Sequence, residues 1–308
     1  MTPQCTNGVM PMFVTATGQV LPCCMTQYYD SPFSNDPLFN VNNASFGDII
    51  TSDRWHEMLA SIPSVNDPVC AKFCSSEGSR VPFDPDDTPY NGGTGHRMDI
   101  IQVELTNTCT LKCQYCRRQT HPHRLNRDHL PLDVAWDVIS HKHWFKLIDC
   151  AIYGDPIWYD HNFALLDRMI DNPTMDHYAI SLAATGRGMD YWKEMVDRWD
   201  KLNQRGVDMY IVFGIDGGPS TSKIHRVNQD WNEITQALQL VAQTDITPIL
   251  QFIPMSFNEH DLDYMMLLAE KWGAEFLLRR SHRFVGNDTN KPSEGLFDDY
   301  EKRTTQTV

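Results

Sequence analysis

The chain lacks the long apolar segments and the basic stripes that would assign it to a membrane or to nucleic acid. No apolar run approaches the roughly 18 residues that a transmembrane helix needs. The first residues form neither a basic segment nor an apolar segment of the kind found in secretory leaders. The 26 basic side chains are outnumbered by 40 acidic ones, giving a net charge of −14, and they form no stripe that could follow a phosphate backbone. We therefore expect a cytoplasmic protein that binds neither a membrane nor a large nucleic acid.

Length and cysteine content indicate more than one domain and a metal site. A chain of 308 residues exceeds the usual size of a single domain, so we expect one large domain and one small one. Nine cysteines would indicate disulfides in a secreted protein. In a reducing compartment the same clustering indicates metal ligation instead.

Three cysteines form one tight run, Cys109-x-x-x-Cys113-x-x-Cys116. The run follows an apolar segment at 99–105 that is rich in β-branched residues, as a buried parallel strand requires. A [4Fe–4S] cluster normally takes four thiolates, one for each iron, so this loop would leave one iron open to a small molecule. Zinc is the alternative, but tetrahedral zinc would need a fourth ligand nearby.

Strand-like and helix-like segments alternate from about residue 98, which predicts an α/β fold with parallel strands. Apolar residues at helical spacing separate the strands, and we expect these stripes to pack in the core. The pattern makes six β/α units, with strands expected at 99–105, 145–153, 178–183, 209–215, 249–253 and 275–278.

The cysteine run, with aromatic Tyr115 before its last cysteine, resembles the signature of the radical S-adenosylmethionine (SAM) enzymes. The resemblance implies a partial (β/α)6 barrel over 98–284, with the active site at the C-terminal ends of the strands. It also implies that SAM chelates the open iron and is cleaved by one electron. The resulting 5′-deoxyadenosyl radical would abstract hydrogen from the substrate, and Tyr115 would lie beside the adenine.

The second expected strand is followed by Gly154-Asp155-Pro156, which resembles the Gly-Gly-Glu-Pro motif that receives the SAM amino group in this family. The match departs twice, because Tyr153 replaces one glycine and Asp155 is one methylene shorter than glutamate. Backbone carbonyls and a carboxylate can still bind an ammonium group. A plain turn is the alternative.

The fourth expected strand ends in Gly-Ile-Asp216-Gly, which is similar to the family's Ser-Ile-Asp-Gly element. The resemblance assigns Asp216 to a ribose hydroxyl or a substrate amine, and Arg226 suits the SAM carboxylate. A turn aspartate and a surface ion pair are the alternatives. Ser181 and Thr185 are weaker candidates at the third strand end. Asn258 either faces the nucleoside or caps a helix.

The first 80 residues show no β/α alternation but contain five cysteines, Cys5, Cys23, Cys24, Cys70 and Cys74. The spacing resembles the twitch or SPASM module, which binds an auxiliary [4Fe–4S] cluster. We expect Cys5, Cys23, Cys70 and Cys74 as its ligands, with Cys24 as a possible substitute, and structural zinc as the alternative. A short hairpin turning at Thr17-Gly18 should precede the cysteine pair.

The expected domains are therefore the module at 1–80, a Pro- and Gly-rich linker at 81–97, the barrel at 98–284 and a polar, mobile tail at 285–308. The implied function is hydrogen abstraction from a peptide or protein side chain, assisted by the auxiliary cluster. The implied electron donor is a flavodoxin or ferredoxin. Radical modification of a small metabolite or nucleotide derivative is one alternative, and a non-catalytic iron–sulfur binding or assembly protein is another.

Overall fold

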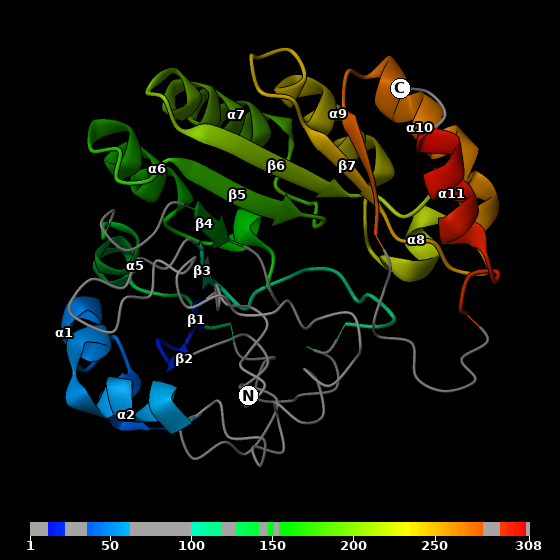
Figure 1. Ribbon diagram of the computed structural model, residues 1–308. Helices are drawn as coiled ribbons and strands as arrows, with labels where there is room; N and C mark the ends of the chain where they lie inside the picture. The colour runs from blue at the N-terminus through cyan, green and yellow to red at the C-terminus, as the bar shows by residue number, and fades with distance from the viewer. Residues whose placement is uncertain are drawn as a thin grey trace. The chain divides into compact units, whose positions relative to one another are not determined.

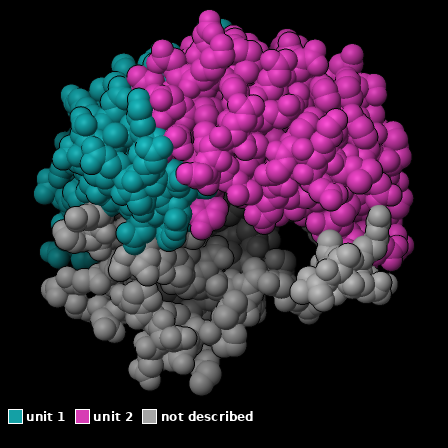
Figure 2. Space-filling view, turned by 90° about the horizontal axis from the view of Figure 1, so that it is seen from above, with its two compact units in different colours: residues 1–108, 123–180, 201–209 teal, residues 109–122, 181–200, 210–308 magenta. Residues whose placement is uncertain are grey.

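The computed structural model describes residues 12–21, 36–61, 100–116, 118, 127–141, 147–150, 154–279 and 290–305. It divides into two compact units, coloured separately in Figure 2. Unit 1 comprises residues 1–108, 123–180 and 201–209, and unit 2 comprises the remainder. Several predictions fall outside the described residues: the five N-terminal cysteines, Tyr153 and the linker at 81–97.

Unit 1 is built on a sheet in which the order of the strands is β2-β1-β3-β4-β5 (Figure 1). The strands are β1 (Met12–Val14), β2 (Val20–Leu21), β3 (Ile100–Val103), β4 (Leu147–Cys150) and β5 (His177–Leu182). Strand β2 pairs antiparallel with β1, and the other neighbours pair in parallel. The parallel pairing of β3, β4 and β5 confirms the first part of the predicted β/α pattern.

The predicted hairpin at the N-terminus is confirmed, but the sequence did not predict where it pairs. Gly18 occupies the turn with a φ of +87°, a conformation that a residue without a Cβ adopts at little cost. Strand β1 then lies parallel to β3, with Phe13 opposite Gln102. The hairpin therefore extends the sheet that begins the barrel, beside the strand that leads to the cysteine run.

Helices of unit 1 bury apolar residues at helical spacing. They are α1 (Phe46–Thr51), α2 (Asp53–Ser61), α5 (Leu132–Ile139) and α6 (Asn162–Asp171), with short 3-10 turns η2 (Pro37–Phe39) and η4 (Pro156–Trp158). Ser45 caps α1, because its side chain accepts a hydrogen bond from the Asp48 amide. Phe39 and Trp55 meet edge to face with ring centroids 5.3 Å apart.

Unit 2 contains a parallel ladder of β6 (Asp208–Gly214), β7 (Ile249–Phe252) and β8 (Glu275–Leu278). The helices in this part of the sequence are α7 (Met189–Gln204), α8 (Ser222–His225), α9 (Trp231–Val241), α10 (Leu262–Lys271) and α11 (Leu296–Thr305), with the 3-10 turn η5 (Glu259–Asp261) before α10. Each of the six strands from β3 to β8 is followed by a helix, as the sequence predicted. The α7 stripe of Trp192, Met195 and Trp199 is buried, as expected of core packing.

Residues 296–305, part of the tail that the sequence predicted to be polar and mobile, form the helix α11. Leu296, Phe297 and Tyr300 recur at helical spacing within a polar segment. The Tyr300 ring packs on Phe276 of β8 with centroids 6.1 Å apart, and burial raises the pKa of Tyr300. In the part of the chain that is described, no helix is both long and apolar enough to cross a membrane.

Candidate functional site

The cysteine run belongs to unit 2, where the side chains of Cys109, Cys113 and Cys116 are half-buried. A turn is closed inside the run by a hydrogen bond from the Cys116 amide to the Cys113 carbonyl, at 3.0 Å. Three half-buried thiols in one loop could ligate three of the four irons of a [4Fe–4S] cluster, which normally takes four thiolates. Across the described residues, however, no three His, Cys, Asp or Glu side chains are gathered in a way that could bind a metal ion.

Backbone hydrogen bonds connect the run to the segment that ends α8. The Lys112 amide donates to the Val227 carbonyl at 3.0 Å, and the Gln114 amide donates to the His225 carbonyl at 3.1 Å. Both donors lie between the cysteines, on a stretch with no helix or strand of its own. The segment 225–227 therefore sets the path of the loop.

Side chains add further connections around the first cysteine. The Thr110 hydroxyl donates to the Thr185 carbonyl, and the Asn228 amide donates to the Thr110 carbonyl, each at 3.2 Å. Arg118 donates through Nη1 to the Cys109 carbonyl at 3.0 Å. Thr185, which the sequence proposed as a weak SAM contact, thus supports the loop through its backbone.

Tyr115 lies between the cysteine run and two other segments of unit 2. Its ring is tilted against the His225 ring, with centroids 5.9 Å apart. Its hydroxyl accepts a hydrogen bond from Nδ2 of Asn290 at 2.7 Å. These contacts fix the ring, and the predicted position beside an adenine stays a prediction.

Asp216 and Arg226, proposed separately as ligand contacts, form a buried ion pair. Nε of Arg226 lies 2.8 Å from Oδ2 of Asp216, and the two side chains are 11% and 0% exposed. The other oxygen, Oδ1, accepts a hydrogen bond from the Ile253 amide at 2.9 Å. Gly214 makes room for the guanidinium, because a Cβ there would lie 2.6 Å from an Arg226 nitrogen. The surface ion pair considered as the alternative is wrong, because this pair is buried.

The backbone of Asp216, like its side chain, accepts a hydrogen bond. Nδ2 of Asn258 donates to the Asp216 carbonyl at 3.0 Å, and Oδ1 of Asn258 accepts from the Met255 amide at 2.6 Å. Asn258 precedes η5, yet its side chain makes no capping bond there. Asn258 therefore occupies the N-cap position considered from the sequence but makes no side-chain cap, and its buried amide connects the segments that follow β6 and β7.

The Gly154-Asp155 element lies in unit 1 against the residues that precede the cysteine run. The Asp155 amide donates to the Thr108 carbonyl at 2.9 Å, and the buried Asp155 carboxylate accepts from the Ile157 amide at 3.2 Å. A Cβ on Gly154 would overlap the Thr106 carbonyl, so only glycine fits without a shift. The backbone at Gly154 thus lies directly against the segment that precedes the cysteine run.

Asn107 and Asp128, which the sequence did not indicate, join the segment before Cys109 to residues that follow the run. Nδ2 of Asn107 donates to the Asp128 carboxylate at 2.8 Å, and the Asp128 amide donates to Oδ1 of Asn107 at 2.9 Å. No local pattern predicts this pair, because it depends on where the chain returns after 21 residues.

The remaining predicted residues are placed as follows. Pro156 begins η4, and its carbonyl accepts a hydrogen bond from Asn162 at 2.6 Å. Ser181 is half-buried within β5. Cys150 is a buried thiol in β4, and burial raises its pKa to about 12. That environment is typical of a small core residue and not of a metal ligand.

Comparisons with known proteins match both parts of the chain. Residues 5–75 match the SPASM family, described as an iron–sulfur cluster-binding domain. A probable GTP 3′,8-cyclase of Methanocaldococcus jannaschii is 24% identical over 182 residues, which are 58% of each protein. Streptococcus suis SuiB bound to S-adenosylmethionine has a TM-score of 0.53 at 12% identity, over 83% of this chain and 54% of that one. SuiB bound to precursor peptide SuiA matches with a TM-score of 0.53 at 11% identity, over 82% and 60%.

The chain spans little more than half the length of the first of these relatives in each comparison. The matched SPASM range begins at Cys5 and extends just past Cys74, so it contains all five N-terminal cysteines. The predictions of an N-terminal iron–sulfur module and of the fold class are therefore confirmed. Which cysteines bind the auxiliary cluster stays a prediction.

Proposed function

We propose that this chain, a relative of the radical SAM proteins that carry a SPASM domain, is an enzyme that cleaves SAM reductively. Cys109, Cys113 and Cys116 would bind the [4Fe–4S] cluster, which supplies the electron that generates a 5′-deoxyadenosyl radical from SAM. The observation that carries the proposal is the run of three half-buried cysteines in one loop, whose path is set by backbone hydrogen bonds to residues 225–227.

The other residues are proposed to bind SAM or to position the loop. Gly154, Asp155 and Pro156 would receive the amino group, which suits an element hydrogen-bonded to Thr108 immediately before the first cysteine. Tyr115 would lie beside the adenine. The SAM site would be completed by Ser181, Asp216 and Arg226. Asp216 and Arg226 would act as a pair, because they form a buried ion pair in which each neutralises the charge of the other.

We further propose a peptide or protein substrate, with the auxiliary cluster on Cys5, Cys23, Cys70 and Cys74 assisting its oxidation. A structural relative, SuiB, has been crystallised with a precursor peptide, which favours this class. A nucleotide substrate is the second candidate, because the matched curated relative is named as a probable GTP 3′,8-cyclase. A flavodoxin or ferredoxin would supply the electron.

The proposal is tested by measuring 5′-deoxyadenosine after anaerobic reconstitution with iron and sulfide and reduction with dithionite. Wild-type protein should form the product from SAM, and Cys109→Ala should form none, because the cluster loses one of its three thiolates. Cys70→Ala should retain the activity, since its thiol belongs to the other cluster. Cys150→Ala is the matched control and should behave as wild type.

If wild-type protein formed no 5′-deoxyadenosine, the proposed enzymatic activity would be contradicted. A non-catalytic iron–sulfur binding or assembly protein would then be the remaining hypothesis. The iron content of the same samples shows how many clusters each variant binds. About eight irons per chain are expected for two cubanes and about four in either single-site variant, on the basis of four irons per cluster. Loss of all iron in Cys70→Ala would contradict the division into two independent sites.

A further inference from the structure

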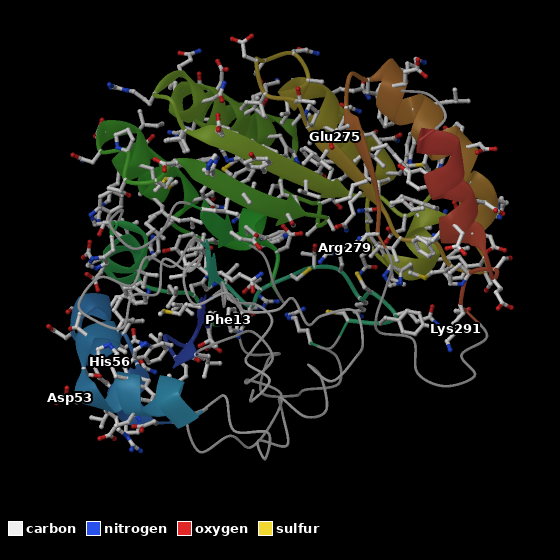
Figure 3. The ribbon with its side chains drawn as sticks, viewed as in Figure 1. Phe13, Asp53, His56, Glu275, Arg279 and Lys291 are labelled. Carbon is white, nitrogen blue, oxygen red and sulfur yellow. The ribbon has the colours of Figure 1, made fainter. Side chains whose placement is uncertain are left out.

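Arg279 is the first residue after β8, and the protein fixes its guanidinium at the end of that strand (Figure 3). Its amide donates to the Phe252 carbonyl at 2.9 Å, which continues the pairing with β7. Its Nη1 donates to Oε1 of Gln251 at 3.0 Å, and Gln251 is only 8% exposed. An exposed cation is thus oriented by a buried neutral amide.

No carboxylate neutralises this guanidinium among the residues that the structure describes. Other arginines do have acidic partners within 4 Å: Arg54, Arg168, Arg198 and Arg226. Gln251 accepts a hydrogen bond from Arg279 but contributes no charge. Within the described part of the chain, the positive charge of Arg279 is therefore not compensated by a carboxylate.

The register of unit 2 places Arg279 on a defined face of its ladder. Gly214 of β6 is opposite Gln251 of β7, and Gln251 is opposite Leu277 of β8. Because side chains two residues apart share a face of a strand, Arg279 follows Leu277 on that face. The Arg226 guanidinium lies against Gly214 of β6, two strands from β8, and is neutralised by Asp216. Arg279 has no such carboxylate among the described residues.

The position corresponds to the functional end of this kind of fold. Active sites in parallel β/α barrels lie at the C-terminal ends of the strands, and unit 2 also contains the cysteine run.

We propose that Arg279, oriented by Gln251, determines substrate specificity by binding a carboxylate of an acidic peptide. A guanidinium matches the two oxygens of a carboxylate with parallel hydrogen bonds. One oriented guanidinium suits a single carboxylate better than a triphosphate, which carries several charges. This inference rests on the proposed peptide-modifying function and adds the chemical class of the side chain that is recognised.

The test selects peptides from a random 12-residue display library on the full, anaerobically reconstituted chain. Wild-type protein should enrich Asp or Glu at one position, because its uncompensated cation favours an acid there. A selected peptide and its twin with Gln in place of Glu are then compared by fluorescence anisotropy. Arg279→Ala should weaken binding of the acidic peptide about tenfold or more and leave the twin unchanged, as expected for loss of a charge-assisted bidentate contact.

Two further variants separate recognition from folding. Arg279→Glu should reverse the preference toward Lys or Arg at the same position, and Arg205→Ala, an exposed arginine in a different part of the chain, should bind as wild type. Selection without Asp or Glu enrichment, or equal losses for the acidic peptide and its twin, would overturn the proposal. GTP binding that is lost in Arg279→Ala, without selection of acidic peptides, would assign the residue to phosphate and also overturn it.

Formation of 5′-deoxyadenosine without peptide distinguishes this inference from the function on which it rests. Arg279→Ala should cleave SAM at the wild-type rate, because the residue is proposed to contact only the peptide. If wild-type protein failed to cleave SAM, the proposed enzyme would fail, while the peptide selection would still decide whether Arg279 recognises an acid.

Discussion

At the scale of single residues, the environment distinguishes thiols that can bind metal from one that cannot. Cys109, Cys113 and Cys116 are half-buried, whereas Cys150 is 1% exposed in β4. Burial removes the water that would stabilise a thiolate, and this raises the Cys150 pKa to about 12. Because the thiolate is both the nucleophile and the metal ligand, Cys150 should be inert toward iron and toward alkylation.

Alkylation of folded, cluster-free protein with iodoacetamide at pH 8 tests this difference. A thiol with a pKa near 12 is ionised to about one part in ten thousand at that pH, so Cys150 should remain unmodified. The three cysteines of the run should be labelled, as peptide mass spectrometry would show. In denaturant Cys150 should react as fast as the others. Rapid labelling of Cys150 in the folded protein would contradict the burial on which the prediction depends.

At the scale of elements, the sequence predicted what depends on local periodicity. Apolar spacing indicated the strands β3 to β8 and the helices between them, because residues that face a core recur with the period of their own element. The turn at Gly18 was also predictable, because its sequence signal lies within a few residues. The pairing of β1 with β3 was not predictable in this way, because it depends on a register between segments more than 80 residues apart.

The candidate site shows the same limit. The cysteine run and the Gly154 element are contiguous motifs, and both were visible in the sequence. The Asp216–Arg226 pair was not, although both residues were singled out, because their contact depends on how α8 returns over Gly214. Asn258 is a related case: it occupies the N-cap position considered from the sequence, but its side chain is turned to the Asp216 carbonyl.

Breaking the buried ion pair should destabilise the fold and loosen the cysteine run. Arg226→Ala leaves the Asp216 carboxylate buried without the arginine. The free energy of unfolding should therefore fall by roughly 3–5 kcal/mol, as is typical when one partner of a buried ion pair is removed. Urea unfolding would measure this loss of free energy. The rate at which the three thiols react with a disulfide reagent should rise, since the chain that follows His225 sets the path of the run.

A matched substitution elsewhere separates the effect of the buried pair from that of losing any arginine. Arg54 pairs with Glu57 on α2, where the two side chains are 51% and 68% exposed. Exposed pairs of this kind contribute about 0.3–0.5 kcal/mol, so Arg54→Ala should cost much less than Arg226→Ala. Equal losses in the two variants would refute a special role for the buried pair.

At the scale of the whole molecule, the N-terminal module and the first strand of the barrel are joined by backbone bonds. The Glu104 amide donates to the Val14 carbonyl at 2.8 Å, and the Glu104 carboxylate accepts from the Ala16 amide at 3.1 Å. These bonds lie at the end of β3, a few residues before Cys109. The hairpin is therefore part of the same sheet as β3 in unit 1.

A fragment that begins at residue 98 should consequently associate with itself. Without β1, strand β3 would expose a row of unpaired amides and carbonyls, which is a template for pairing with another chain. Size-exclusion chromatography of the fragment should show aggregates where the full chain is monodisperse. Removing residues 296–308 takes away a helix and no strand, and it should cause less aggregation. A monodisperse fragment with native circular dichroism would contradict the prediction.

The pairing of β1 with β3 also constrains how this gene could have been assembled. Cluster-binding segments can be exchanged between proteins most easily when a linker is all that joins them to their host. Here a transposition of the first 80 codons to the 3′ end would have to be accompanied by a new neighbour for β3. Moving residues 1–80 to the other end of the chain would therefore leave one edge of β3 open unless β1 could return to it.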